Sequence, residues 1–190
     1  MCSTHRSEIA TGLTLIELLI SICIVSVLVS FAFSTRTWIA RIEVDSDRTQ
    51  MAAIINLARS SAIQLNHSVT LCPGSDAGCG HRNEWHLGTV AFVDYNNNKQ
   101  IDEQDKLLGS IAQLTNRVTW RSFRNRSYLK FVATGHTDWQ NGHFKFCPEG
   151  TQDHALSRQL VLNAAGRLYF SRDEDGDGLH EDVQGNDLTC

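Results

Sequence analysis

Proline is scarce in this sequence. Only two prolines occur among its 190 residues, Pro73 and Pro148, and each directly follows a cysteine. Neither proline nor glycine occurs between Leu13 and Asn66. Because these two residue types most readily bend or end a helix, nothing in that segment interrupts one.

The sequence also lacks a basic excess and a recognisable catalytic motif. The net charge is −4, so any binding to nucleic acid would need a local basic patch. There is no nucleophile elbow and no His-Glu-x-x-His motif. We therefore expect a protein that is not an enzyme, and a membrane-anchored enzyme is only the third hypothesis for its function.

Charged residues are absent over the eighteen positions from Leu18 to Thr35, which is about the minimum for a bilayer-spanning helix. A secretory signal peptide would have a shorter apolar core followed by small residues at a cleavage site. An ordinary membrane anchor does not account for Glu17, since burying a carboxylate in lipid costs about 2–3 kcal/mol or more.

The stretch from Gly12 to Ile20 reads Gly-Leu-Thr-Leu-Ile-Glu-Leu-Leu-Ile and resembles the cleavage motif of type IV prepilins. In that family a membrane-embedded aspartyl peptidase cuts after the glycine and methylates the new terminal amine. The resemblance implies that residues 1–12 are a leader peptide, that Leu13 is the first mature residue, and that Glu17 is the family's glutamate at the fifth position. Leu13 differs from the commoner phenylalanine.

Glu17 is predicted to direct assembly, because a carboxylate in hydrocarbon needs a partner. The terminal amine of a neighbouring subunit could supply that partner and set the register between subunits. The alternative is a glutamate that only reaches the membrane interface.

The helix predicted from this segment has two parts. Residues 13–35 form the transmembrane part, and residues 36–66 continue it as an amphipathic helix that packs on a globular domain. The apolar stripe of the second part follows steps of three, four and seven. Its members are Met51, Ile54, Ile55, Ala58, Ala62 and Leu65.

Residues 67–190 change to the pattern of short strands, rich in β-branched and aromatic residues and separated by Gly, Asn, Asp and Ser. The strand predictions cover 67–71, 85–95, 118–123, 128–133, 143–146 and 159–162, and a return strand over 167–170 after a turn. A long N-terminal helix on an antiparallel sheet, an α+β fold, fits this order.

The whole chain resembles the FimT/FimU minor pilins and the H-type (GspH) pseudopilins of type II secretion. Beyond the cleavage motif, the resemblance rests on the Cys72 to Cys79 loop, the strand ending Phe92-Val93-Asp94, and the turn from Asn163 to Arg167 before a terminal cysteine. It implies a type IV pilin-like fold in a single-pass protein of the bacterial inner membrane. The C-terminal domain would lie in the periplasm, and the subunit could be extracted into a pilus or pseudopilus.

Two of the six cysteines, Cys2 and Cys23, precede or lie within the apolar run, and an even number remains. An even number is typical of an oxidising compartment. We predict one local disulfide between Cys72 and Cys79, and a second between Cys147 and Cys190. The alternatives are free thiols or a zinc site with the nearby histidines His81 and His86, which would need about four ligands.

Two loops carry the alternating oxygen ligands of a calcium loop. The first has Asp173, Asp175 and Asp177 before Gly178; its twelfth position is Gln184, for which Glu181 or Asp182 could substitute. The second has Asp94, Asn96 and Asn98, with Lys99 in place of glycine and Asp105 at position twelve. Calcium is the one cofactor that the sequence suggests, and the alternative is a pair of polar turns.

Basic and aromatic residues alternate over fourteen positions without an acid, a pattern that suits DNA backbone contact and base stacking. The basic residues are Arg117, Arg121, Arg124, Arg126 and Lys130. Some FimT-type pilins bind DNA through Gly-Arg-x-Arg near the C-terminus; here Gly166 and Arg167 are present, but Tyr169 replaces the second arginine. Acids from Asp173 to Asp187 would repel phosphate, and the alternative is a charged strand edge.

The leading hypothesis is therefore a structural one. The mature protein would be a minor pilin or pseudopilin that primes or caps a type IV pilus or a type II secretion pseudopilus. Its partners would be the prepilin peptidase and other minor and major pilins or pseudopilins. The second hypothesis is a DNA receptor at the pilus tip for natural transformation.

Overall fold

The computed structural model describes residues 14–74, 79–149 and 154–190. They form two compact units, one up to Ile39 and one from Ala40 to Cys190. Helix α1, Leu15–Leu65, contributes to both units. Among the described residues, no helix combines the length and the apolarity that crossing a membrane requires.

Helix α1 has 51 residues and begins and ends with local signals in the sequence. Thr14 Oγ1 accepts a hydrogen bond from the Glu17 amide at 3.3 Å, as a residue that caps a helix N-terminus does. After Leu65, Asn66 takes the left-handed conformation with φ of 55°, in which asparagine often ends a helix. The helix predicted over 13–66 is thus present with nearly the expected bounds.

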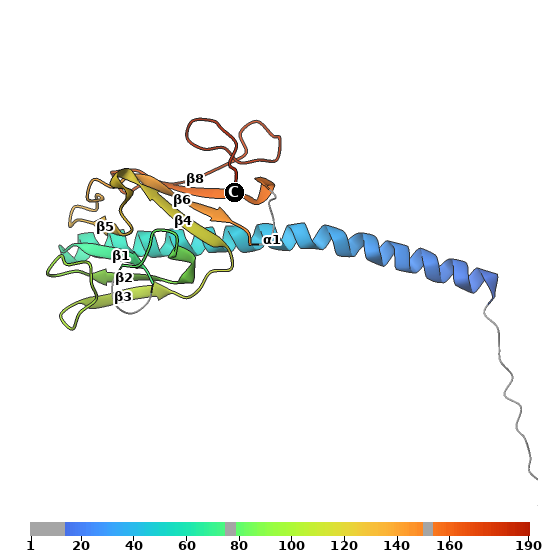
Figure 1. Cartoon of the computed structure of the whole chain (residues 1–190), viewed down its shortest axis with the longest axis horizontal. Helices are drawn as coiled ribbons and strands as arrows, with labels where there is room; N and C mark the ends of the chain where they lie inside the picture. Colours follow the sequence, from blue (N-terminus) through green and yellow to red (C-terminus); the bar gives the residue numbers. More distant parts are fainter. Residues whose placement is uncertain (1–13, 75–78, 150–153) are drawn as a thin grey trace, which may run out of the picture. The chain divides into compact units, whose positions relative to one another are not determined.

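The unit from Ala40 to Cys190 contains two antiparallel four-stranded sheets, where the sequence predicted one. The first sheet has the order β3-β2-β1-β5 and the second β4-β6-β7-β8. The eight strands of the two sheets are β1 Val69–Pro73, β2 Thr89–Val93, β3 Lys106–Ile111, β4 Arg117–Ser122, β5 Leu129–Phe131, β6 Gly142–Cys147, β7 Arg158–Leu162 and β8 Leu168–Phe170. The C-terminal half of α1 runs alongside both sheets (Figure 1).

The core of this unit lies between α1 and the two sheets. The predicted helix stripe is buried from Met51 to Ala62, whereas Leu65 is 38% exposed. The sheets contribute an aromatic cluster in which the Trp120 ring stacks on Phe144, with centroids 4.2 Å apart, and Trp85 meets Phe144 edge-on at 4.9 Å. Such pairs add to the stabilisation from apolar burial.

One buried polar contact joins the helix to the loop before β4. The Asp47 carboxylate accepts hydrogen bonds from the Asn116 amide at 2.8 Å and from Asn116 Nδ2 at 2.7 Å. Both residues are only 3% exposed. Buried polar groups need such partners, so the pair fixes where the helix sits against the sheets.

Candidate functional site

The predicted processing and assembly residues lie at the start of the chain. Gly12 and Leu13 are outside the described residues. Glu17 is exposed in the first turn of α1. Large apolar side chains are exposed around it and along the following turns: Leu15, Ile16, Leu18, Leu19, Ile20, Ile22, Ile24, Val25, Val27, Leu28 and Val29.

The acidic loop after β8 brings four carboxylates together. Asp173, Asp175, Asp177 and Glu181 each offer an oxygen, and these oxygens all lie within 4.8 Å of one another. The turn is closed by backbone donors: the Gly178 amide donates to Asp173 Oδ2 at 2.9 Å. Glu181 and Asp182 were the two candidates to substitute for the ligand at position twelve. Of these two, Glu181 belongs to the cluster.

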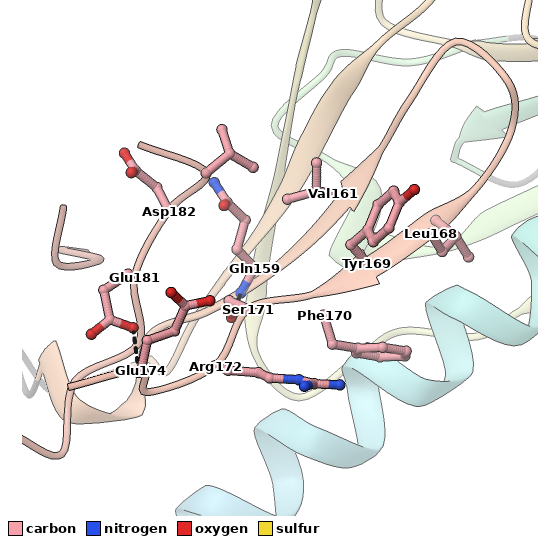
Figure 2. A pocket seen from close by; sticks show the side chains of 11 residues that line it. Gln159, Val161, Leu168, Tyr169, Phe170, Ser171, Arg172, Glu174, Glu181 and Asp182 are labelled. Carbon is pink, nitrogen blue, oxygen red and sulfur yellow. Dashed lines mark hydrogen bonds between the residues drawn. The ribbon is translucent and has the colours of Figure 1, made fainter. Parts of the chain in front are cut away.

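Asp182 faces elsewhere and accepts hydrogen bonds from the amides of Gln184 and Asn186. Figure 2 shows Glu181 beside Glu174, with Asp182 projecting away from both. The loop borders an open hollow of about 530 Å³ whose other wall is formed by β7 and β8.

The negative charge of this cluster acts on the neighbouring residue Asp187, which pairs with Glu181 in an isolated β-bridge. The pKa of Asp187 is raised by partial desolvation and then by the charges of Asp177, Asp175 and Glu181. Carboxylates that are close to one another disfavour each other's ionised forms. Among the described residues, no lysine or arginine forms an ion pair with the four clustered acids.

The second candidate loop, which follows β2, forms the same turn but contains side-chain amides that donate hydrogen bonds to a carboxylate. The Lys99 amide donates to Asp94 Oδ2 at 3.2 Å, and Lys99 takes φ of 63°, the conformation for which glycine was expected. Asp102 Oδ2 is hydrogen-bonded by the side-chain amides of Asn96 at 2.7 Å and Asn98 at 3.2 Å. Amide donors therefore satisfy this carboxylate from within the loop.

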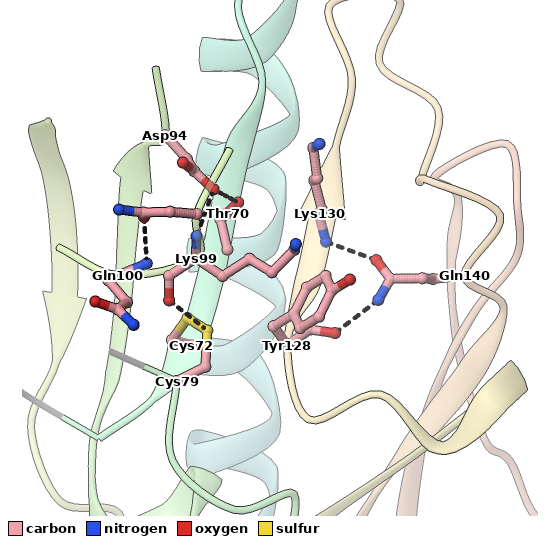
Figure 3. Close-up of a disulfide and its surroundings, with 10 residues drawn as sticks. Thr70, Cys72, Cys79, Asp94, Lys99, Gln100, Tyr128, Lys130 and Gln140 are labelled. Atoms are coloured by element: carbon pink, nitrogen blue, oxygen red, sulfur yellow. Dashed lines mark hydrogen bonds between the residues drawn. A yellow bond between two sulfur atoms is a disulfide. The ribbon is translucent and has the colours of Figure 1, made fainter. Parts of the chain in front are cut away.

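The structure pairs Cys72 with Cys79 and Cys147 with Cys190, the two disulfides that the sequence predicted. Figure 3 shows the first of them close to Lys99 and the Tyr128 ring. Because Cys79 is oxidised in this pair, it provides no thiolate for the alternative zinc site. The second disulfide links the last residue of the chain to the end of β6.

The basic residues counted in the sequence lie on several different elements. Arg126 pairs with Asp138 at 3.2 Å, and Lys130 Nζ donates to Asn97 Oδ1 at 2.8 Å. Arg124 lies in the short 3-10 helix η2, Phe123–Asn125, and Arg167 in the turn before β8. Of these residues, only Arg117 and Arg121 share a strand, β4, and both occupy exposed positions on it.

Two residues from the neighbouring strand β6 complete a basic group with this pair. Arg121 is opposite His143, and Thr119 is opposite Lys145. Burial, then Arg121 and Arg117, lower the pKa of Lys145; burial, then Arg121 and Lys145, lower that of His143. The sequence analysis missed these two residues, although the alternation from His143 to Phe146 indicates that both face outward.

Comparisons with known proteins agree with the family resemblance seen in the sequence. The family model described as type II transport protein GspH matches residues 48–166. No curated protein matches the sequence significantly. Two crystal structures of the type IV minor pilin FimU from Pseudomonas aeruginosa have the same fold, with TM-scores of 0.51 and 0.53 and identities of 19% and 20%. They cover 67% and 70% of this chain, and 92% and 90% of FimU.

The minor pseudopilin EpsH from the type 2 secretion system of Vibrio cholerae is 10% identical, with a TM-score of 0.48. That comparison covers 67% of this chain and 95% of EpsH.

Proposed function

The chain belongs to the GspH family of minor pilins and pseudopilins, and from this premise we propose that it primes or caps the assembly of a type IV pilus or a type II secretion pseudopilus. Residues 1–12 are the leader that prepilin peptidase removes, and residues 13–35 anchor the chain in the inner membrane with its C-terminal domain in the periplasm. The role is structural rather than catalytic.

The observation that carries this proposal is the exposed first part of α1. Every described residue from Thr14 to Ser30 is exposed, and most are large and apolar. An apolar helix surface without a partner in its own chain is stable only where lipid or other subunits cover it. Bundled helices of other pilins or pseudopilins would cover it in the assembled filament.

Glu17 gives this surface its one acidic group. In the proposed assembly, its carboxylate pairs with the methylated terminal amine of the adjacent subunit. Attraction between opposite charges is strong where water is excluded, so this pair would set the register of the subunit in the filament.

The first test is the mass and N-terminal sequence of the membrane-extracted protein from cells with and without prepilin peptidase. A methylated N-terminus at Leu13 that depends on the peptidase would support the proposal. An intact N-terminus in both strains, or a cut near Ser34, would refute it. Glu17→Ala should leave this processing intact and reduce incorporation into filaments. Glu43→Ala, at an exposed position of α1 beyond the apolar run, should leave both processing and incorporation unchanged.

DNA binding is a second candidate function, and the basic group on β4 and β6 is the observation that favours it. Arg117, Arg121, His143 and Lys145 lie on adjacent strands, where phosphate contacts would give salt-sensitive binding. Retention of double-stranded DNA that falls with salt and is lost in Arg121→Ala would support it. Arg167→Ala tests the turn that resembles the FimT motif, and retention equal to wild type in both variants would argue against DNA.

A further inference from the structure

The acidic loop between β8 and Cys190 holds more negative charge than its own contacts neutralise. The four clustered carboxylates come from a segment of nine residues, and backbone amides are their recorded partners. Close approach of like charges is unfavourable unless a cation compensates it. A loop that brings these four acids together, three of them exposed and Glu181 buried, is therefore suited to a positive ligand.

Glu181 provides independent evidence for a ligand. Its side chain is 8% exposed, although glutamate is rarely buried without a partner. Oε2 accepts a hydrogen bond from the Glu174 amide at 3.0 Å, but Oε1 is buried with no hydrogen-bond partner among the described residues. A buried carboxylate oxygen without a partner is costly, and the residue that carries this one is a member of the cluster.

The loop after β2 serves as an internal comparison. Both loops close with the same hydrogen bond, from the amide of the sixth residue to the carboxylate of the first, Gly178 to Asp173 and Lys99 to Asp94. In the second loop the third and fifth positions are asparagines, and their side chains donate to Asp102. In the acidic loop those positions are aspartates, which have no donor to give.

We propose that Asp173, Asp175, Asp177 and Glu181 bind one calcium ion. Calcium takes six to eight oxygen ligands at about 2.3–2.6 Å, so two oxygens on one ion are at most about 4.6–5.2 Å apart. The observed spacing, within 4.8 Å, meets this condition. The four acids occupy positions one, three, five and nine of the loop; position seven, which supplies a backbone carbonyl in such loops, is Leu179.

The donor set favours calcium over other metals. All four side chains offer hard carboxylate oxygens, whereas zinc, copper, nickel and iron are better matched by nitrogen or sulfur ligands. The adjacent His180 is engaged elsewhere, with Nδ1 2.9 Å from the Ser171 carbonyl oxygen. Magnesium needs a smaller, nearly ideal octahedron, which a loop with several carboxylates does not impose. Because position twelve lacks its glutamate, we expect a Kd on the order of 10⁻⁵–10⁻⁴ M.

Calcium bound at this site would stabilise the conformation of the C-terminal segment. The Glu181 amide donates to the Arg172 carbonyl at 3.0 Å, and the Leu188 amide to the His180 carbonyl at 2.8 Å. A bound ion would join both ends of the loop between these contacts. This role concerns the domain's fold and does not depend on the proposed place of the subunit in a filament.

The test uses the full chain, purified in detergent and freed of metal with a chelator, and titrates it with calcium chloride by isothermal calorimetry. One site is expected, with magnesium chloride binding at least tenfold more weakly. Glu181→Gln and Asp175→Asn should each weaken calcium binding tenfold or more. Glu174→Gln is the matched control, since it removes the same charge from the same loop outside the cluster, and it should change the Kd less than threefold.

Two results would overturn the proposal. One is the absence of calcium binding by the wild-type chain at 5 mM, about fifty times the highest expected Kd. The other is equal weakening by all three substitutions, which would indicate diffuse attraction to acidic surface. Should Glu181→Gln unfold the domain, as circular dichroism would reveal, Asp175→Asn decides the matter because that side chain is exposed.

Discussion

Replacing Asp47 by alanine removes the buried contact that joins α1 to the loop before β4. Its carboxylate oxygen accepts two hydrogen bonds from Asn116, one from the main chain and one from the side chain. A hydrogen bond to a charged group contributes about 1.5–3 kcal/mol, and an unpaired buried donor carries a similar cost. Because one oxygen serves both donors, we expect the loss to be about 3 kcal/mol rather than the sum of two full bonds.

Urea unfolding of the compact unit Ala40–Cys190 measures this loss, with the fluorescence of the buried Trp85 and Trp120 as the signal. Glu43→Ala is the control, because it removes an acid from an exposed position of the same helix and should change the free energy of unfolding by less than about 0.5 kcal/mol. A loss below about 1 kcal/mol for Asp47→Ala would refute the reasoning that this contact fixes the helix.

Three further predictions concern the same unit. Cys147→Ser opens a disulfide with a sequence separation of 43, and should lower the free energy of unfolding by about 4 kcal/mol in urea. Gly135→Ala places a methyl group 2.6 Å from Ile63 Cδ1 at φ of +77°, and should lower it by about 1–3 kcal/mol. Arg121→Ala should raise the pKa of His143 in an NMR titration, because burial and then the Arg121 charge lower it. Since the folded form disfavours the protonated ring, stability should fall as the pH drops below about 6.5, and should fall less in this variant.

The helix and most strands could be predicted because their signals are local. The absence of proline and glycine and the regular stripe from Met51 to Ala62 indicated α1, and the stripe is buried as expected. Strand β3 was missed because its six residues are exposed or half-buried and show no alternation. The division into two sheets was also missed, since strand pairing joins residues far apart in the sequence.

For the candidate sites too, the sequence predicted what depends on local spacing and missed what depends on tertiary structure. Spacing alone identified the first three acids of the loop, but it left Glu181 and Asp182 as equal choices. The proximity of the Glu181 carboxylate to the three aspartates, and the hydrogen bonds of Asp182 to the amides of Gln184 and Asn186, decide between them, and only the folded loop shows these contacts. Counting basic residues along the sequence joined Arg121 to Lys130, which belong to different sheets, and overlooked Lys145 on the adjacent strand.

The order of strands has a consequence for the folding of the chain while it is being made. Strand β5 belongs to the first sheet but follows β4 of the second, so the chain crosses between the sheets and returns. The first three strands can pair early, yet β1 keeps an unpaired edge until β5 arrives. The second sheet is complete only with β8, near the end of the chain. A chain made from its N-terminus therefore exposes open strand edges, which are prone to aggregation, until β8 has been made.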